Sequence, residues 1–243
     1  MGDPTARASR AHRPRAGRLY PPAGPHTLWG WPDVRASWTW PGCEGIAFKV
    51  DVYAACDTVE LLLNGRSLGV RPVQHAGHPT MGEEKPLSVS RPITPALNLT
   101  ATFEAPYEPG ELKAVGYVDG KAIAEATLMT AGPSAMIRLT PDRPLIPAAS
   151  DSLCYVTVEV TDQDGRVDPN AGQTIYFTVK GEGDIAAIGS GHPASIECYR
   201  GNQRRAFQGR CLVVVKSNGR LGQIRLRAQA DGLDPAEAVI QAA

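Results

Sequence analysis

Four tryptophans lie close together near the start of the chain and could contact a sugar. Trp29, Trp31, Trp38 and Trp40 stand in HTLWGWPDVRASWTWPG (26–42) as two W-x-W pairs, and these are all the tryptophans of the 243 residues. In an extended segment alternate side chains point to the same side, so each pair presents both rings on one face. Such rings can stack on a sugar, anchor another domain or fill a core. The residue types alone leave all three interpretations open.

Paired carboxylates are the second kind of residue that could do chemistry. Hydrolysis of a glycosidic bond needs two carboxyl groups about 5–10 Å apart, one of them with a raised pKa. The candidate pairs are Glu182 with Asp184 and Asp162 with Asp164. Both pairs stand in turns that contain glycine, where Asp and Gly supply the backbone geometry. We therefore interpret them as turn formers, and no catalytic residue is predicted.

A metal site has weak support. Asp162, Asp164 and Asp168 in TDQDGRVDPN invite a calcium interpretation, but the segment lacks the bidentate Glu that closes an EF-hand loop. His75 and His78 stand in a long loop with no further ligands nearby in the sequence, and the five cysteines contain no C-x-x-C. The sequence predicts no metal and no cofactor.

Two further segments carry reactive or charged side chains. His192 stands near Ser190 and Ser195, but no G-x-S-x-G elbow or orienting acid accompanies them, which favours a polar loop. The run NQRRAFQGR (202–210) is either a basic patch or an exposed loop with Phe207 pointing inward. Phosphate-binding glycine loops are missing from the sequence.

The charge balance narrows the classes of partner. The chain has 25 basic and 25 acidic residues and no net charge, which argues against nucleic acid or an anionic membrane as the main partner. No apolar run approaches the roughly 18–20 residues that span a bilayer. Residues 1–25 hold five arginines and no apolar h-region, so they are not a secretory signal. They are either a basic nucleic-acid arm or, as we predict, a disordered leader. The compartment is unknown: cytoplasmic by default, secreted if a signal lies upstream.

The elements that must position these residues are strands. From Gly45 onward the sequence alternates with period two, as in IAFKVDVY and TVELLLNGRSLG, and turns are predicted at Asn64-Gly65 and Asp119-Gly120. TAGPSA (130–135) interrupts the pattern, and a second alternating unit follows, in which Cys154 and Cys211 are interpreted as small core residues.

The fold class is therefore predicted to be all-β, with two tandem immunoglobulin-like β-sandwiches after a disordered N-terminal leader. The predicted domains are the leader (1–25), a first sandwich (26–132), expected as a meander of about seven strands, and a second sandwich (133–243).

Several long motifs resemble one known family. SWTWPGCEG, VDVYAACDTVELLLNGRSLG and FEAPYEPGELKAVGYVDGKAIAEATLMTAG are similar to the first β domain after the catalytic barrel in glycoside hydrolase family 2 enzymes of the β-galactosidase type. LCYVTVEVTDQDGRVDPNA and GNQRRAFQGRCLVVVKSNGRLGQIRLRAQADGL resemble the family's last, immunoglobulin- or invasin-like domain. The resemblance covers roughly residues 28–243, in the family's order.

The resemblance implies a non-catalytic portion of a sugar hydrolase. In the family a (β/α)8 barrel carries the acid/base glutamate and the nucleophilic glutamate, and nothing like it precedes Thr27, so no catalytic residue can be carried over. The expectation is a truncated, inactive accessory portion whose partner is the catalytic barrel of a parent enzyme. The alternative is a free-standing module that binds carbohydrate or a cell surface. Because Trp29, Trp31, Trp38 and Trp40 stand where the family's barrel meets its first post-barrel domain, interdomain contact is the favoured role for them, and sugar contact, which the module alternative would use, is the other.

Overall fold

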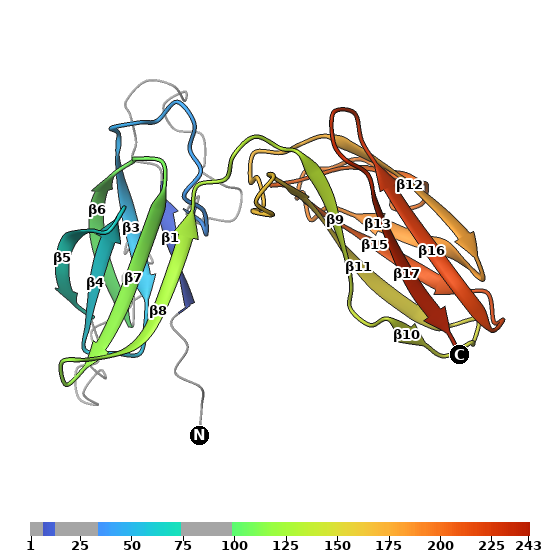
Figure 1. The fold of residues 1–243 in the computed structure, drawn as a ribbon, viewed down its shortest axis with the longest axis horizontal. Helices are drawn as coiled ribbons and strands as arrows, with labels where there is room; N and C mark the ends of the chain where they lie inside the picture. Colours follow the sequence, from blue (N-terminus) through green and yellow to red (C-terminus); the bar gives the residue numbers. More distant parts are fainter. Residues whose placement is uncertain (1–6, 13–33, 74–98) are drawn as a thin grey trace, which may run out of the picture. The chain divides into compact units, whose positions relative to one another are not determined.

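Strands and turns make up the whole of the described chain. The computed structural model describes residues 7–12, 34–73 and 99–243, and within them it contains no helix. The chain divides into two compact units, Met1–Thr130 and Ala131–Ala243 (Figure 1). The predicted all-β fold with two sandwiches in series is confirmed. In the predicted leader, Arg7–His12 is strand β1, while residues 1–6 and 13–25 lie outside the described residues; the leader's disorder and the predicted domain bounds stay predictions.

The first unit holds two four-stranded sheets whose strands pair antiparallel. One sheet has the order β2-β1-β3-β6 and the other the order β5-β4-β7-β8. The strands are β1 (Arg7–His12), β2 (Val34–Arg35), β3 (Ala47–Tyr53), β4 (Thr58–Leu63), β5 (Arg66–Pro72), β6 (Thr100–Pro106), β7 (Glu111–Val118) and β8 (Lys121–Met129). The predicted meander is wrong, because β3 pairs with β6 whereas β4 pairs with β5 and β7. Alternation determines which face of a strand is buried, but it does not determine the sheet to which the strand belongs.

Two hairpins of this unit form where the sequence predicts them. Asn64 and Gly65 have φ angles of 50° and 78°, and Asp119 and Gly120 have 49° and 73°. Both central residues of each turn thus take positive φ, as a two-residue turn of type I′ requires. The inward side chains of β4, at Val59, Leu61 and Leu63, are at most 1% exposed and pack with those of β3, β6 and β7 in the core of the unit.

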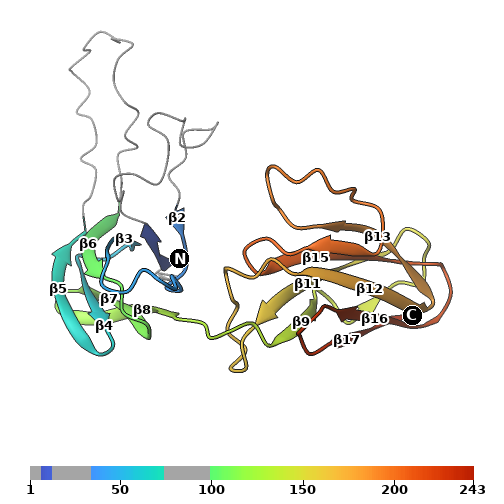
Figure 2. The same cartoon turned by 90° about the horizontal axis from the view of Figure 1, so that it is seen from above.

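The second unit packs a four-stranded sheet C against a five-stranded sheet D. Sheet C has the order β13-β15-β11-β9 and sheet D the order β10-β17-β16-β12-β14, and Figure 2 shows them as two layers. The strands are β9 (Met136–Pro141), β10 (Leu145–Ile146), β11 (Leu153–Thr161), β12 (Thr174–Gly181), β13 (Gly183–Gly189), β14 (Gln203–Arg205), β15 (Arg210–Ser217), β16 (Gly222–Gln229) and β17 (Ala236–Ala242). All pairs are antiparallel except β10 with β17.

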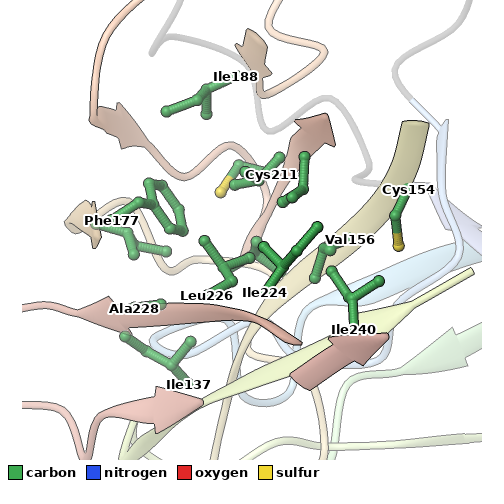
Figure 3. Close-up of a cluster of buried hydrophobic side chains, with 14 of the residues drawn as sticks. Ile137, Cys154, Val156, Phe177, Ile188, Cys211, Ile224, Leu226, Ala228 and Ile240 are labelled. Carbon is green, nitrogen blue, oxygen red and sulfur yellow. The ribbon is translucent and has the colours of Figure 1, made fainter. Parts of the chain in front are cut away.

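Alternate residues of both sheets meet in the core of the second unit (Figure 3). Cys154 and Cys211 are 0% and 4% exposed, which confirms that they are core residues. Burial raises the pKa of the Cys154 thiol to about 11 and that of Cys211 to about 12. The other residues labelled in the figure are Ile137, Val156, Phe177, Ile188, Ile224, Leu226, Ala228 and Ile240. Both thiols are therefore protonated at neutral pH and act as apolar core groups.

Candidate functional site

Trp38 lies in the core of the first unit. Its side chain is 0% exposed, and its ring meets those of Phe48 and Tyr107 edge-on, with centroids 6.1 and 5.3 Å away. Its Nε1–H donates to the carbonyl of Glu108 over 2.9 Å. Trp40 is half-buried, with its ring 5.2 Å from that of Phe48. Trp38 thus belongs to an aromatic cluster that fills the core, and its ring has no exposed face for a sugar.

The backbone of Trp38 also fixes the end of the first unit. The Thr130 hydroxyl donates to the Trp38 carbonyl over 2.6 Å and accepts the N–H of Gly110 over 2.9 Å. Trp29 and Trp31 lie outside the described residues. Sugar or interdomain contact therefore stays a prediction for these two tryptophans.

Asp162, from the candidate pair Asp162 and Asp164, is a buried anchor. It is 3% exposed; its Oδ1 accepts the backbone N–H groups of Asp164 (3.0 Å) and Arg166 (2.8 Å), and its Oδ2 accepts that of Gly132 (2.8 Å). Burial raises the pKa of Asp162, but these three donors and the Arg166 guanidinium outweigh it and hold the pKa below its ordinary value. A carboxyl group kept ionised in this way cannot serve as a general acid near neutral pH.

The other acidic candidates also stabilise turns or face solvent. Asp168 accepts the hydroxyl of Ser134 over 2.7 Å, and Glu182 accepts the side-chain amide of Asn218 over 2.9 Å. Asp184 is exposed on β13. Within the described ranges, no three His, Cys, Asp or Glu side chains gather closely enough to hold a metal ion. The carboxylates of the predicted turns thus contact turn and linker residues rather than one another.

The histidine candidate does not form a catalytic group. His192 Nδ1 accepts the N–H of Ala194 over 3.0 Å, and its ring lies 4.5 Å from that of Phe207. The Ser195 hydroxyl bonds instead to the Glu197 carboxylate over 3.2 Å. The interpretation as a polar loop agrees with these contacts.

The remaining histidines of interest, His75 and His78, lie outside the described residues.

The run NQRRAFQGR is neither a basic patch nor a simple loop. Arg204 is 1% exposed in β14, between the outward-pointing Gln203 and Arg205. Arg210, in β15, lies on the other sheet and pairs with Glu159 over 2.9 Å. The three arginines therefore have three different environments. The alternation of side chains along a short strand could have predicted that Arg204 points inward. A charged residue at an inward position, however, is usually interpreted as part of a loop.

The Arg204 guanidinium holds the long segment between β13 and β14. It donates to the carbonyls of Ile188, Glu197 (3.3 Å) and Cys198 (2.9 Å), and it lies 3.5 Å from the Glu197 carboxylate. The ring of Tyr199 lies 5.2 Å from the guanidinium carbon. A buried charge needs such partners, since an unpaired one is costly. Arg204 is thus a structural residue whose two Nη groups bond to β13 and to the segment that follows it.

A search of the described ranges finds no helix long and apolar enough to cross a membrane.

Comparisons with known proteins agree with this arrangement of strands. Residues 137–239 match the glycoside hydrolase family 2 C-terminal domain 5, and residues 45–124 match DUF4982, a domain of unknown function. The chain is 38% identical over 209 residues to the β-galactosidase BoGH2A of Bacteroides ovatus, which is 84% of this chain and 22% of that protein. The chain carries C-terminal domains of glycoside hydrolase family 2.

Solved structures of two glycosidase-related proteins contain the same fold. A family 2 member from Bacteroides cellulosilyticus is 32% identical, with a TM-score of 0.80 over 97% of this chain and 28% of that one. A β-glycosidase from Bacteroides vulgatus is 27% identical, with a TM-score of 0.71 over 84% and 24% of the two chains. The chain thus spans 22–28% of the length of these relatives and corresponds to the C-terminal portion of a family 2 protein.

Proposed function

We propose that the chain is a non-catalytic accessory portion of a β-galactosidase-like family 2 hydrolase, in which other domains cleave O-glycosyl bonds. Its role is to support the catalytic barrel of the parent enzyme. The match to the C-terminal portion of family 2 enzymes supports this proposal.

The pKa directions of the carboxyl groups carry the non-catalytic part of the proposal. A glycosidase needs a carboxylic acid whose pKa is raised, so that it can protonate the leaving group. Among the described residues, every Asp or Glu with a resolved shift has a lowered pKa. Hydroxyl donors lower the pKa of Glu60. For Asp142, Glu159, Asp162 and Glu197 burial raises it, but N–H donors and arginines outweigh burial.

Hydrolysis by the purified chain is the first test. We expect no release of nitrophenol from p-nitrophenyl β-D-galactoside above the rate in buffer. Turnover that survives purification and disappears in the Asp162→Asn or Glu182→Gln variant would overturn the non-catalytic assignment.

Support of a barrel is tested by complementation. The Bacteroides ovatus relative would be shortened to remove the region that this chain matches, and the chain added in trans. We expect partial recovery of thermal stability or β-galactosidase activity in the shortened relative. An equimolar unrelated β-sandwich protein is the control, and equal recovery with that control would contradict the proposal.

The alternative is a free-standing module that binds carbohydrate or a cell surface, and its support is the tryptophan cluster together with the resemblance of the second unit to an invasin-like domain. Burial of Trp38 removes one ring from that argument. Trp29 and Trp31 lie outside the described residues, so carbohydrate contact through them stays a prediction.

A further inference from the structure

The outer face of sheet D is unusually rich in cationic side chains. Its outward positions come from β12, β14, β16 and β17, and we call them the basic face: Tyr176, Thr178, Lys180, Gln203, Arg205, Gln223, Arg225, Arg227, Gln229, Glu237, Val239 and Gln241. Four of these side chains are cationic and one is a carboxylate. The chain as a whole has no net charge, so this surplus of three positive charges is local.

On the outer face of sheet C two cations are paired with one carboxylate. There Glu159 pairs with both Arg138 (2.7 Å) and Arg210 (2.9 Å). On the basic face, the single carboxylate of Glu237 reaches Arg225 over 3.3 Å. In the second unit, whose residues are all described, neither Lys180 nor Arg227 has an ion pair. On sheet C the cation without an ion pair, Lys216, lies opposite Asp184, whereas on sheet D Lys180 lies opposite another cation.

The strand register brings two of these cations together. Lys180 of β12 lies directly opposite Arg225 of β16, and both are exposed. Like charges at opposed positions destabilise a sheet. Arg227 is on the same face two residues further along β16, about 7 Å from Arg225. Three cations thus surround one stretch of surface, where a bound anionic group would offset their repulsion.

An aromatic ring and amides adjoin the cations. Tyr176 is 42% exposed and lies opposite Gln229, and together with Ala230 and Asp231 they line an open hollow of about 490 Å³. A tyrosine ring can stack on the apolar face of a sugar, while amide and carboxylate groups bond to hydroxyls. Gln203 of β14 lies opposite Tyr176 on its other side and continues this row across the sheet. The face therefore combines groups for anions with groups for polyhydroxylated rings.

We propose that the basic face binds an acidic polysaccharide, a glycan chain that carries carboxylate or sulfate groups. Lys180, Arg225 and Arg227 hold the anionic groups, and Tyr176 stacks on a neighbouring sugar ring. Charge complementarity argues for an anion, and the family 2 context argues for a glycan rather than nucleic acid. This choice rests in part on the family 2 context of the proposed function, but it assigns a binding site that the accessory role does not require.

The test measures binding of the full chain by titration calorimetry and by affinity electrophoresis. The probes are polygalacturonate, which carries carboxylates, heparin, which also carries sulfates, and neutral β-1,4-galactan. We expect binding to at least one acidic glycan that weakens with added salt, and none to galactan. Comparison of the two acidic probes shows whether the face binds carboxylate groups or sulfate groups.

Three variants decide whether the basic face is responsible. R225Q/R227Q should weaken binding of the acidic glycan about tenfold or more, and Tyr176→Ala should weaken it severalfold. K216Q/R220Q removes the same charge from exposed positions that do not belong to the basic face and should bind like the wild type. Circular dichroism checks that each variant is folded.

The following results would overturn the proposal: no binding to either acidic glycan by the folded chain, equal loss in K216Q/R220Q, or equal affinity for galactan. If the chain binds oligo-dT more tightly than either acidic glycan, and Tyr176→Ala leaves that binding unchanged, the proposal would also be overturned in favour of a nucleic-acid surface. R225Q/R227Q is also added to the shortened relative, in parallel with the binding tests. If this variant restores the stability or activity of the shortened relative, the accessory role stands even when the binding site fails.

Discussion

Replacing Arg204 by methionine is the sharpest test of the way the second unit is held together. Methionine fills a similar volume but donates no hydrogen bond, so the carbonyls of Ile188, Glu197 and Cys198 lose their donor. A buried carbonyl left without a partner costs about 1–3 kcal/mol. The bond to Ile188 is buried, whereas those to the other two carbonyls are partly buried and can be replaced by water. We expect Arg204→Met to lower the free energy of unfolding by about 2–4 kcal/mol.

The positions of the tryptophans make the assay selective. All four tryptophans belong to the first unit, so their fluorescence reports unfolding of that unit, while far-UV circular dichroism follows both. With a urea m-value of about 2 kcal/mol/M for a unit of this size, a loss of 3 kcal/mol lowers the midpoint of the second unit by about 1.5 M. The fluorescence transition should stay in place. Arg205→Met, which removes the outward neighbour, is the matched control and should cost below about 1 kcal/mol.

Two results would refute this reasoning. If Arg204→Met and Arg205→Met shift the dichroism midpoint equally, the buried hydrogen bonds contribute no more than an exposed side chain. If the tryptophan transition moves with the dichroism, the substitution acts through something other than local bonding in the second unit. Hydrogen exchange adds a direct readout, because amides between β13 and β14 should lose protection first in Arg204→Met.

Three further outcomes are expected. Asp162→Asn should lower the stability of the second unit by about 1–3 kcal/mol at pH 7. Hydrogen bonds and Arg166 hold the pKa of Asp162 below its ordinary value despite burial. The stability that Asp162 contributes is therefore present above about pH 4 and is lost as the pH falls through its folded-state pKa. The free energy of unfolding of the variant should accordingly change less with pH in an acid titration. Cys198 is exposed, whereas the other four cysteines are buried. In the folded chain at pH 8 a disulfide reagent such as DTNB should therefore rapidly modify one thiol, that of Cys198. Cys198→Ala should remove this fast phase. Gly181→Ala should lower the free energy of unfolding by several kcal/mol in urea, because the added Cβ would lie 2.0 Å from the Gln223 carbonyl oxygen. Gly120 has a similar positive φ but open space around it, so Gly120→Ala should cost about 1 kcal/mol. Equal losses in the two variants would contradict the steric argument.

Local features of the fold could be predicted from the sequence because they depend on near neighbours. The turn at Asn64-Gly65 and the inward faces of β4 and β11 follow from residue type and period two. The division of strands between sheets could not be predicted in this way. β3 and β4 are adjacent in sequence but belong to different sheets, and this depends on pairings with strands more than forty residues away.

The functional residues were harder to predict than the strands. The turn interpretation of Asp162 and Asp164 survives because the backbone donors that occupy Asp162 are close in sequence, apart from Gly132. The environment of Trp38 could not be found from sequence, because its aromatic neighbours come from β3 and from the segment after β6. The basic face was also missed, because its four cations are divided among β12, β14 and β16 and a zero net charge conceals them.

The short outer strands of sheet D bear on how the protein behaves at high concentration. An open sheet edge exposes a row of unpaired backbone groups that can recruit a second chain and start aggregation. Here β10 and β14, the two end strands, have only two and three residues. Such short end strands give a second chain little to pair with. They also cover little of their neighbours, because β10 pairs only with Gln241 and Ala242 of β17 and β14 only with residues 174–176 of β12. Any edge-to-edge association of sheet D should therefore begin on the remaining residues of β12 and β17.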